Sequence, residues 1–293
     1  MNVKPEPRLR FIFITTCIES RFFDPVIKGM NDAATMLGVD CSFTGTEGVD
    51  LEAQAQMVRQ AIQEGYDGIA LNIIDPAAFD AVVQEAMDKG IPVVAFNVDD
   101  HATPNARLSA VCQQLYNAGQ TLGRKALDHI RPGSHILMTM HAEGVSALED
   151  RLRGAQDILR EKDITWTVAI TGNTADQSAQ SITKQLKANP RIRHILCTGQ
   201  ADTEGAGLAI ESSFPRYTAA GFDLSTNTLR LIRAGHVRFT IDQQPYIQGF
   251  YPVVQLTHYC KYGILPADMD SGVTIIDKNN VDRVIHLCEQ QYR

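Results

Sequence analysis

The sequence predicts an α/β protein of two lobes, each built around a doubly wound parallel β-sheet with helices on both faces. Short apolar runs alternate with helical patterns along almost the whole chain of 293 residues, and this alternation is typical of parallel sheets. Roughly ten such runs occur, which is too many for one open sheet. Two lobes of similar size are therefore expected, and no linker rich in Pro, Gly or Ser separates them.

The first part of the chain contains five predicted strands and three predicted helices. The strands are residues 9–17, 39–45, 67–74, 91–97 and 107–112. A helix over 23–37 stops at Gly38 and a second over 50–65 stops at Gly65, because glycine commonly follows the end of a helix. In the second helix, apolar residues recur every three or four positions, which indicates one buried face. A third helix is predicted over 76–89.

The same alternation continues in the second part of the chain. The predicted strands are residues 134–140, 165–170, 193–199, 217–222 and 237–241. The last of them meets Asp242-Gln243-Gln244, and a helix is predicted from Tyr246 onward. Since side chains alternate along a strand, Gln243 is expected to face away from Asp242 and Gln244. Pro245 suits the start of the helix, where its missing N–H is not needed.

Composition and charge exclude several classes of function. A hydrophobic content of 44% and a formal charge of −7 are those of a soluble globular protein without a nucleic-acid-binding surface. No apolar stretch approaches the ~20 residues of a membrane span. The first residues show no signal peptide. A cytoplasmic protein, or an exported one whose signal is not part of this chain, is expected.

Motifs for metals, cofactors and catalysis are not found in the sequence. The six cysteines have no CxxC or Cys/His spacing, and Cys17, Cys112 and Cys197 are predicted to be buried free thiols. There is no GxGxxG after the first strand and no GxxxxGK[ST]. His141-Ala-Glu143 lacks the PCxxC of zinc deaminases. The chain is therefore predicted to be no enzyme and to carry no metal or cofactor.

Polar residues gather where the predicted strands end. In doubly wound sheets, ligands bind beyond the carboxyl ends of the strands. The candidate ligand-binding residues are Phe22, Phe23, Asn72, Asn97, Asp99, Arg151, Gln200, Asp202, Asp223 and Gln243. Amides, carboxylates and a guanidinium can pair with vicinal hydroxyls, and aromatic rings can cover C–H surfaces. The set predicts a small polyhydroxylated ligand, although each acid or amide alone also suits a loop or helix cap.

These residues stand in a series of motifs that resembles a known family. The motifs are Phe22-Phe23, NIIDPAAFDAV (72–82), GIPVVAFNVD (90–99), RLRG (151–154), TGQADTEGAG (198–207), GFD (221–223) and TIDQ (240–243). In this order and spacing the chain resembles the periplasmic sugar-binding proteins of ABC transporters, the group that includes ribose-binding protein. The ligand-binding region of lactose-repressor-type regulators shares that fold.

The resemblance implies a type I periplasmic binding protein fold, in which two lobes joined by three crossover strands close on a ligand in the cleft. By this comparison, one lobe is residues 1–110 plus 244–271, and the other is 111–243 plus 272–293. Phe22 and Phe23 correspond to cleft aromatics. Five residues match hydroxyl-binding positions: Asn72, Asn97, Arg151, Asp223 and Gln243. Asp99, Gln200 and Asp202 lie near family contacts. For Gln200 and Asp202, the residue that best matches the family contact is the one between them, Ala201.

Two departures from the family pattern bear on the ligand. Ribose binders have Asp-Arg at the end of the fourth strand, whereas this chain has Asn97-Val98, which argues against ribose itself. They also stack a second-lobe aromatic on the sugar ring, from the loop that is TGNTADQ (171–177) here and contains no aromatic. A less flat ligand such as an acyclic sugar alcohol is one expectation, with Trp166 or Tyr246 as substitute aromatics.

The expected function is that of a monomeric periplasmic receptor that captures a monosaccharide or sugar alcohol and delivers it to a membrane permease of an ABC transporter. Nucleic acid is not an expected partner. Two alternatives stay open. One is the effector domain of a lactose-repressor-type regulator, which would need a helix-turn-helix of ~50–60 residues before the first strand. The other is a small-molecule enzyme on the same fold using Asp and His.

Overall fold

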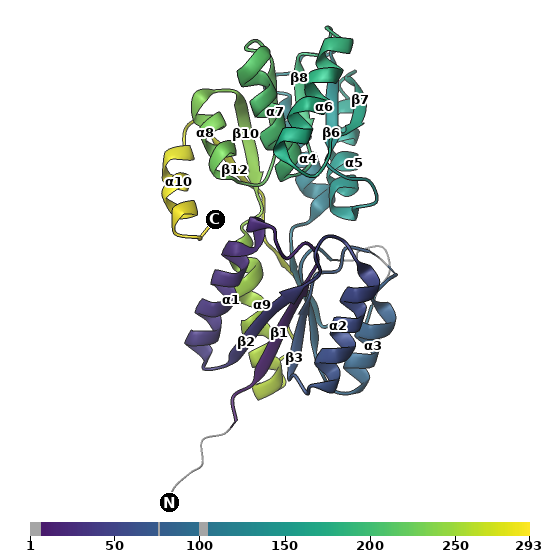
Figure 1. Ribbon diagram of the computed structural model, residues 1–293, viewed down its shortest axis with the longest axis vertical. Helices are drawn as coiled ribbons and strands as arrows, with labels where there is room; N and C mark the ends of the chain where they lie inside the picture. Colours follow the sequence, from purple (N-terminus) through teal and green to yellow (C-terminus); the bar gives the residue numbers. More distant parts are fainter. Residues whose placement is uncertain (1–6, 76, 100–104) are drawn as a thin grey trace, which may run out of the picture. The chain divides into compact units, whose positions relative to one another are not determined.

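The computed structural model describes residues 7–75, 77–99 and 105–293 and divides the chain into two compact units (Figure 1). Unit 1 comprises the chain up to Cys112, residues 244–271 and Tyr292. Unit 2 comprises residues 113–243, residues 272–291 and Arg293. The chain thus passes between the units after Cys112, after Gln243 and after Ser271. The first passage lies two residues later than the predicted boundary, and Tyr292 groups with unit 1.

Unit 1 contains a six-stranded sheet in the order β11-β5-β4-β3-β1-β2, and every neighbouring pair in it is parallel. Its strands are β1 (Arg10–Thr15), β2 (Asp40–Gly45), β3 (Gly68–Leu71), β4 (Val93–Asn97), β5 (Ser109–Cys112) and β11 (Met269–Asp270). Its helices are η1 (Arg21–Phe23), α1 (Asp24–Leu37), α2 (Leu51–Gln63), α3 (Asp80–Asp88) and α9 (Pro245–Tyr262).

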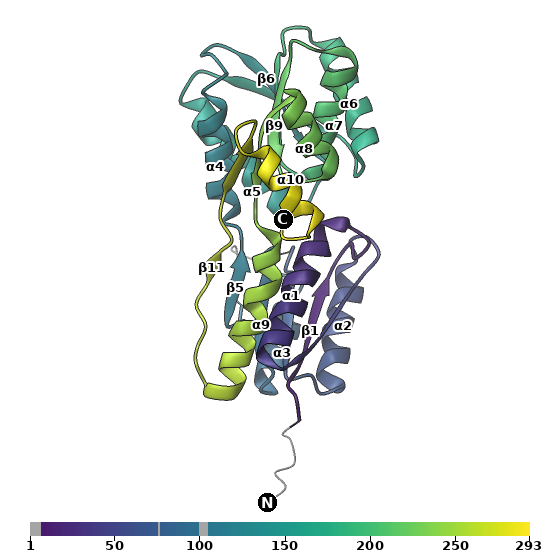
Figure 2. The ribbon, with the colours of Figure 1, turned by 90° about the vertical axis from the view of Figure 1, so that its left-hand side faces the viewer.

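The two faces of this sheet are covered by different pairs of helices. Phe11 and Phe13 of β1 point into a core shared with α1 and α9. Ile12 and Ile14, the intervening residues, point into a core shared with α2 and α3, as the two-residue period of a strand requires. Figures 1 and 2 show α1 and α9 lying along one face of the sheet. Both faces of the strands are therefore apolar, and polar residues are left to the strand ends.

Unit 2 contains a second six-stranded sheet, in the order β12-β10-β9-β8-β6-β7. Its strands are β6 (His135–Met140), β7 (Thr165–Ile170), β8 (His194–Cys197), β9 (Thr218–Phe222), β10 (Val237–Asp242) and β12 (Thr274–Asp277). Its helices are α4 (Leu115–Ala126), α5 (Ser146–Arg160), α6 (Ala175–Ala188), α7 (Gln200–Ser213), α8 (Thr226–Ala234) and α10 (Val281–Glu289).

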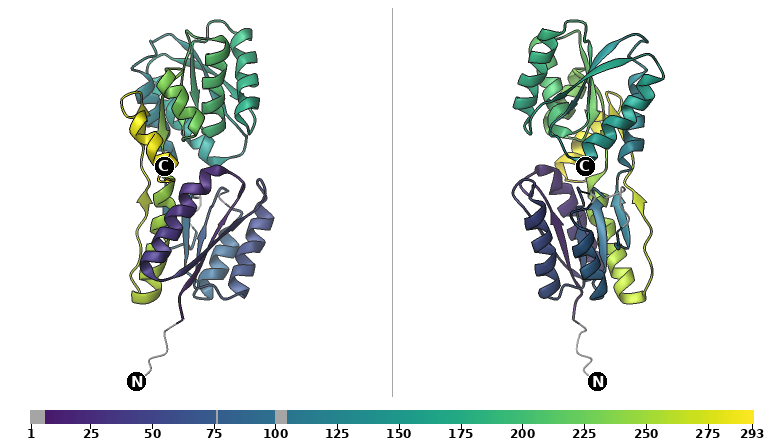
Figure 3. Two further views of the ribbon diagram at one scale, coloured as in Figure 1. Left: turned by 60° about the vertical axis from the view of Figure 1, so that its left-hand side comes forward. Right: turned by 90° about the vertical axis from the view of Figure 1, so that its right-hand side faces the viewer.

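The sheet of unit 2 is also sandwiched between helices. Ile136 and Met138 of β6 pack in a core with α4 and α5. Leu137, between them, packs in a core with α6, α7, α8 and α10. The two views of Figure 3 show these two helical layers on opposite faces of the sheet. The predicted pair of doubly wound α/β lobes is therefore confirmed.

Two helix pairs approach each other through glycines. A Cβ atom added to Gly119 of α4 would lie 2.1 Å from the carbonyl oxygen of Arg151, and one added to Gly154 of α5 would lie 2.1 Å from that of Tyr116. In unit 1, Gly29 of α1 and Gly249 of α9 approach each other's helices equally closely. Real Cβ atoms cannot adopt such distances, so these helices depend on glycine to pack backbone against backbone.

Several details differ from the expectations. The third helix begins at Asp80, because the Asp75 carboxylate accepts the N–H groups of Ala77 and Ala78 and forms a turn first; the predicted start, Pro76, lies outside the described residues. The strands β11 and β12 and the helix α10 were not predicted. They are short, and β12 pairs antiparallel to β10, so that the second sheet is mixed rather than purely parallel.

Candidate functional site

In unit 1, a chain of buried side-chain amides lies beyond the carboxyl ends of β3 and β4. The Asn72 amide donates to Oδ1 of Asn97 at 2.9 Å, and the Asn97 amide donates to Oε1 of Gln248 at 3.1 Å. Gln248, on α9, donates in turn to the hydroxyl of Ser271 at 2.9 Å. Asn97 has a φ of 65°, a left-handed conformation that Asn tolerates better than most residues. The two predicted asparagines therefore belong to one network.

Asp99 has a different role from the other predicted residues of unit 1. Its side chain is fully buried and forms a two-pronged ion pair with Arg107, whose Nε lies 2.5 Å from Oδ1 and whose Nη2 donates to Oδ2. This hydrogen bonding raises the pKa of Arg107 above its ordinary value. The Asp99 carboxylate is therefore paired within the protein.

The two predicted aromatics lie in the short helix η1. Ser20 caps this helix by accepting the N–H of Phe22. The rings of Phe22 and Phe23 meet edge to face, 5.3 Å apart, and Phe23 is buried against Phe43 at 5.7 Å. Phe22 is only partly buried. Phe23 therefore anchors the loop after β1, and Phe22 carries the more accessible ring.

In unit 2, a buried cluster forms around Arg151, on the second turn of α5. Its Nη1 donates to the carbonyl oxygen of Thr198 at 3.0 Å, and its Nε and Nη2 both donate to Oε1 of Gln113, at 3.1 and 2.8 Å. Its guanidinium lies 4.2 Å above the ring of Phe222 and 3.6 Å from the Asp223 carboxylate. The strand ends and the aromatic ring thus hold the guanidinium in one position.

Asp223 and Gln243 complete this cluster. The Gln243 amide donates to Oδ1 of Asp223 at 2.7 Å. Asp223 follows β9 directly and has a φ of 67°, so it repeats in unit 2 the left-handed conformation of Asn97. Burial lowers the pKa of Arg151, while the charges of Asp223 and Asp202 act in the opposite direction. The result is a paired but desolvated guanidinium beside a carboxylate and an amide.

Asp202 and Gln200 occupy the first turn of α7 and serve that helix. The fully buried Asp202 carboxylate accepts the N–H groups of Thr198 at 2.9 Å and Gly199 at 3.0 Å, and the hydroxyl of Thr139 at 2.7 Å. The Gln200 amide donates to the carbonyl oxygen of Leu224 at 2.5 Å. The bonds from the Asp202 carboxylate to the backbone N–H groups are those of a helix cap. Both residues thus have a role within the protein, and their predicted contact with a ligand stays a prediction.

The residues around Gln243 have different partners. Only Asp242 lies in β10, and Gln244 has a φ of 55°, so the expected strand alternation does not extend to Gln244. The Asp242 carboxylate accepts from Arg293 at 2.7 Å, and the Gln244 amide donates to the carbonyl oxygen of Ser271 at 2.6 Å. Pro245 is at the start of α9, as predicted. The Gln243 amide donates to Asp223.

Trp166 lies away from the polar edge of its sheet, and Tyr246 has partners within unit 1. Trp166 is the second residue of β7, at the amino end of the strand, whereas the Arg151 cluster lies beyond the carboxyl ends. The Tyr246 hydroxyl donates to Asp32 of α1 at 2.9 Å, and its ring stacks on Phe250. Burial and Asp32 raise the pKa of Tyr246 to about 12. Both rings are therefore used in packing.

Two polar residues of these clusters were not predicted. Gln113 and Gln248 are both fully buried, one beside Arg151 and one beside Asn97. Gln113 directly follows the first point at which the chain passes between the units. Gln248 lies in the first turn of α9, just after the second such point. An amide at such a position is not distinctive in the sequence. Only its partners reveal its role.

The cysteines are all free thiols. Cys112 and Cys197 are buried, as predicted, but Cys17 is only partly buried, because it has left β1 and adopts a φ of 52°. Within the described residues, no group of three or more His, Cys, Asp or Glu side chains could hold a metal ion, and no helix there is long and apolar enough to cross a membrane.

Comparison with known proteins connects these clusters to a family. The model of the family described as "Periplasmic binding protein domain" matches residues 11–263. The chain is 30% identical over an alignment of 299 residues to a xylose/arabinose-binding protein of Sulfolobus acidocaldarius, which covers 96% of this chain and 74% of the relative. It is 24% identical to the ribose import binding protein of Bacillus subtilis, covering 79% of this chain and 75% of that protein.

Solved structures show the same architecture over almost the full length. A glucose-galactose binding protein from Geobacillus stearothermophilus superposes with a TM-score of 0.85 at 25% identity, covering 94% of this chain and 99% of the other. A carbohydrate transporter protein from Acidothermus cellulolyticus, solved in complex with myo-inositol, gives a TM-score of 0.85 at 28% identity, covering 98% of this chain and all of the other.

Proposed function

Because this chain belongs to the periplasmic binding protein domain family, we propose that it is the solute-binding receptor of an ABC transporter and captures a monosaccharide or sugar alcohol. The polar edge of each unit contributes contacts to the ligand, and closure of the two lobes shields it from water. Relatives named for binding xylose, arabinose and ribose, and a structure holding myo-inositol, support this class of ligand.

The observation that carries the proposal is the cluster of Arg151, Asp223 and Gln243. The sequence motifs predict all three residues as family contacts, and the three are hydrogen-bonded or ion-paired in one place. A guanidinium, a carboxylate and an amide offer donors and acceptors to neighbouring hydroxyls. A ligand that lacks one hydroxyl leaves a buried group unpaired, and this cost is the source of selectivity.

In unit 1, the proposed ligand contacts are Asn72 and Asn97, with Phe22 as the aromatic that covers the C–H surface. An amide and an apolar residue, Asn97-Val98, replace the charge pair that ribose binders carry at this position, so the ligand meets fewer charges in unit 1 than in unit 2. Asp99 and Asp202 are left out of the proposed contacts, because both carboxylates are fully buried and paired with Arg107 and with the backbone at the start of α7. Gln200 is left out because its amide donates to the carbonyl oxygen of Leu224.

The proposal includes a place and a partner. The receptor works outside the cytoplasm as a monomer and docks on the membrane permease of its transporter. It performs no catalysis, since its relatives are named as binding proteins. The effector domain of a transcription regulator, the earlier alternative, is not supported by the relatives.

A thermal-shift and calorimetric screen with D-xylose, L-arabinose, D-ribose, myo-inositol and linear alditols tests the proposal. We expect a small group of these compounds to raise the melting temperature, because a ligand at 100 times its dissociation constant stabilises the native state by about 2.7 kcal/mol. If no sugar or polyol shifts the melting temperature at millimolar concentration, the proposal fails.

The variants Asp223→Ala and Asn97→Ala locate the site. Loss of a hydrogen bond to a charged group costs about 1.5–3 kcal/mol, so Asp223→Ala should weaken binding roughly 10- to 100-fold. Asp163→Ala is the matched control, because Asp163 also has a positive φ of 56° but is exposed. Equal effects of Asp223→Ala and Asp163→Ala on affinity would contradict the assigned site.

A further inference from the structure

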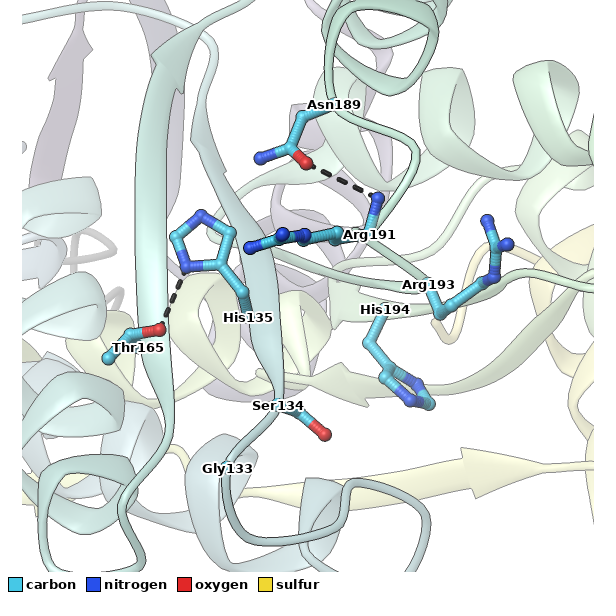
Figure 4. Close-up of a pocket in the computed structure, with 8 residues that line it drawn as sticks. All are labelled: Gly133, Ser134, His135, Thr165, Asn189, Arg191, Arg193 and His194. Atoms are coloured by element: carbon cyan, nitrogen blue, oxygen red, sulfur yellow. Dashed lines mark hydrogen bonds between the residues drawn. The ribbon is translucent and has the colours of Figure 1, made fainter.

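Unit 2 has a hollow of about 670 Å³ at the amino ends of its strands, the edge of the sheet opposite the Arg151 cluster. Figure 4 shows the residues that line it. They are Gly133, Ser134, His135, Thr165, Asn189, Arg191, Arg193 and His194. The lining contains two arginines and two histidines but no carboxylate, although the protein as a whole has a formal charge of −7.

The loop between α6 and β8 presents the two arginines. Ile192 between them is buried, whereas Arg191 and Arg193 are exposed. The Asn189 side-chain oxygen accepts the N–H of Arg191 at 3.2 Å, and the Asn189 carbonyl oxygen accepts the N–H of Ile192. The buried side chain and the two hydrogen bonds hold the loop, so the arginine backbones are fixed before any ligand arrives.

The arginines have no anionic partner in the described part of the chain. Arg193 donates to the hydroxyl of Tyr217, and its guanidinium lies 4.7 Å above that ring. Arg191 forms no ion pair or side-chain hydrogen bond with a described residue, and its guanidinium extends across the hollow toward His135 in Figure 4. A guanidinium normally pairs with a carboxylate or phosphate when one is near. Arg191 is therefore available to an anion from outside.

The other polar groups of the hollow favour the same kind of ligand. The only acceptor of the Asn189 side chain is used by Arg191, which leaves its amide N–H groups as donors. The ring nitrogens of His135 bond to the hydroxyls of Thr165 and Thr167, at 2.8 and 3.0 Å. Burial lowers the pKa of His194, and the charges of His129 and Arg238 act in the same direction.

We propose that this hollow is a binding site for a phosphate-class oxyanion, with Arg191 as its main ligand and Arg193 and the Asn189 amide as its support. Guanidinium groups bind phosphate oxygens through two parallel hydrogen bonds. The anion is either free in solution or carried by the headgroup of an anionic lipid. The site lies apart from the sugar contacts and does not depend on them.

Two titrations at low ionic strength test this proposal, since salt screens exposed charges. Inorganic phosphate is titrated into the full chain and followed by calorimetry and by the ¹H–¹⁵N NMR signals of residues 189–194. Separately, the protein is floated with vesicles of phosphatidylglycerol or of phosphatidylcholine. We expect phosphate binding that weakens about tenfold in Arg191→Gln and further in the double variant with Arg193→Gln.

The control variant is Arg283→Gln on α10, which removes one exposed positive charge from the same unit. It should leave phosphate binding unchanged. Flotation with phosphatidylglycerol alone that is lost in the double variant identifies a lipid headgroup, and phosphate binding without flotation identifies a free anion. No binding of either probe, or binding that Arg191→Gln and Arg193→Gln leave intact, overturns the proposal. Sugar affinity should be the same in all variants, so a failed sugar screen and a failed anion site are distinguishable.

Discussion

Asn97 and Asp223 are equivalent residues in the two units. Each ends or directly follows a central strand, each has a φ near 65°, and each hydrogen-bonds to an amide from a distant part of the chain. Left-handed backbone is costly for residues with a side chain, and Asn and Asp bear that cost best. A left-handed residue at the same position in both sheets indicates a common role, which is to direct a polar side chain beyond the carboxyl end of the strand.

Asp202 lies within a family motif, beside Ala201, the position that matches the ligand contact best. Its carboxylate satisfies two backbone N–H groups and one buried hydroxyl. We expect Asp202→Ala to lower the free energy of unfolding by about 2–4 kcal/mol, because a cap is lost and buried donors are left without partners. Urea denaturation of the ligand-free protein measures this change.

The matched control is Asp176→Ala, which removes an exposed acid from the first turn of α6 while the cap of that helix, Thr174, is kept. Its cost should stay below about 1 kcal/mol, since it removes only an interaction with the helix dipole. An Asp202→Ala protein that is as stable as the control but fails to bind sugar would return Asp202 to the ligand contacts.

At the scale of the elements, the close helix pair α4–α5 connects packing to the proposed site. The carbonyl oxygen of Arg151 is the atom that Gly119 of α4 approaches, and Gly154 stands one turn further along α5. The distance between these helices therefore sets where the Arg151 backbone lies. The pair α1–α9 in unit 1 uses Gly29 and Gly249 in the same way.

Replacing Gly154 by alanine tests this connection. Alanine normally stabilises a helix interior by about 0.5–1 kcal/mol relative to glycine. Here the new methyl group would meet the Tyr116 carbonyl oxygen, so we expect a net destabilisation of about 1–3 kcal/mol and weaker sugar binding. Urea denaturation and calorimetry measure both, with Gln156→Ala on the same helix as control. A Gly154→Ala protein that is more stable than the original would show that the helices separate without cost.

At the scale of the whole molecule, six free thiols share one electrostatic property. Burial is the largest influence on each of them and raises the pKa of every one above its ordinary value of 9.0. The pKa reaches about 12 for Cys41 and Cys288 and about 11 for Cys260. The native protein therefore keeps these protons at pH values where the unfolded chain has lost them.

This difference predicts a loss of stability at alkaline pH. Below about pH 9 the thiols are protonated in both states and contribute their full stability. Between about pH 9 and 12 the native state binds more thiol protons than the unfolded state, so the free energy of unfolding falls as the pH rises. Urea denaturation at pH 8, 9, 10 and 11 measures the slope. The double variant Cys41→Ala/Cys288→Ala should show a shallower decline, and an equal slope would contradict the assignment.

The sequence by itself determined the two lobes, most of the strands and the residues at the strand ends. Apolar runs, helical periodicity and terminal glycines such as Gly38 report local preferences that the folded chain keeps. The motifs likewise placed Arg151, Asp223 and Gln243 correctly relative to their elements. The short strand β12 escaped prediction, since its four residues pair only through a partner more than thirty residues earlier in the chain.

Only the tertiary structure decided which polar groups remain available to a ligand. Asn97 meets Gln248 across 151 positions of sequence, and Gln113 meets Arg151 across 38. Asp99 and Asp202 lie in family motifs, as Asp223 does, yet their carboxylates bond to Arg107 and to the backbone at the start of α7. A residue type and its spacing place a side chain at the edge of a sheet. Whether its hydrogen-bonding capacity is already used depends on chain segments that meet only on folding.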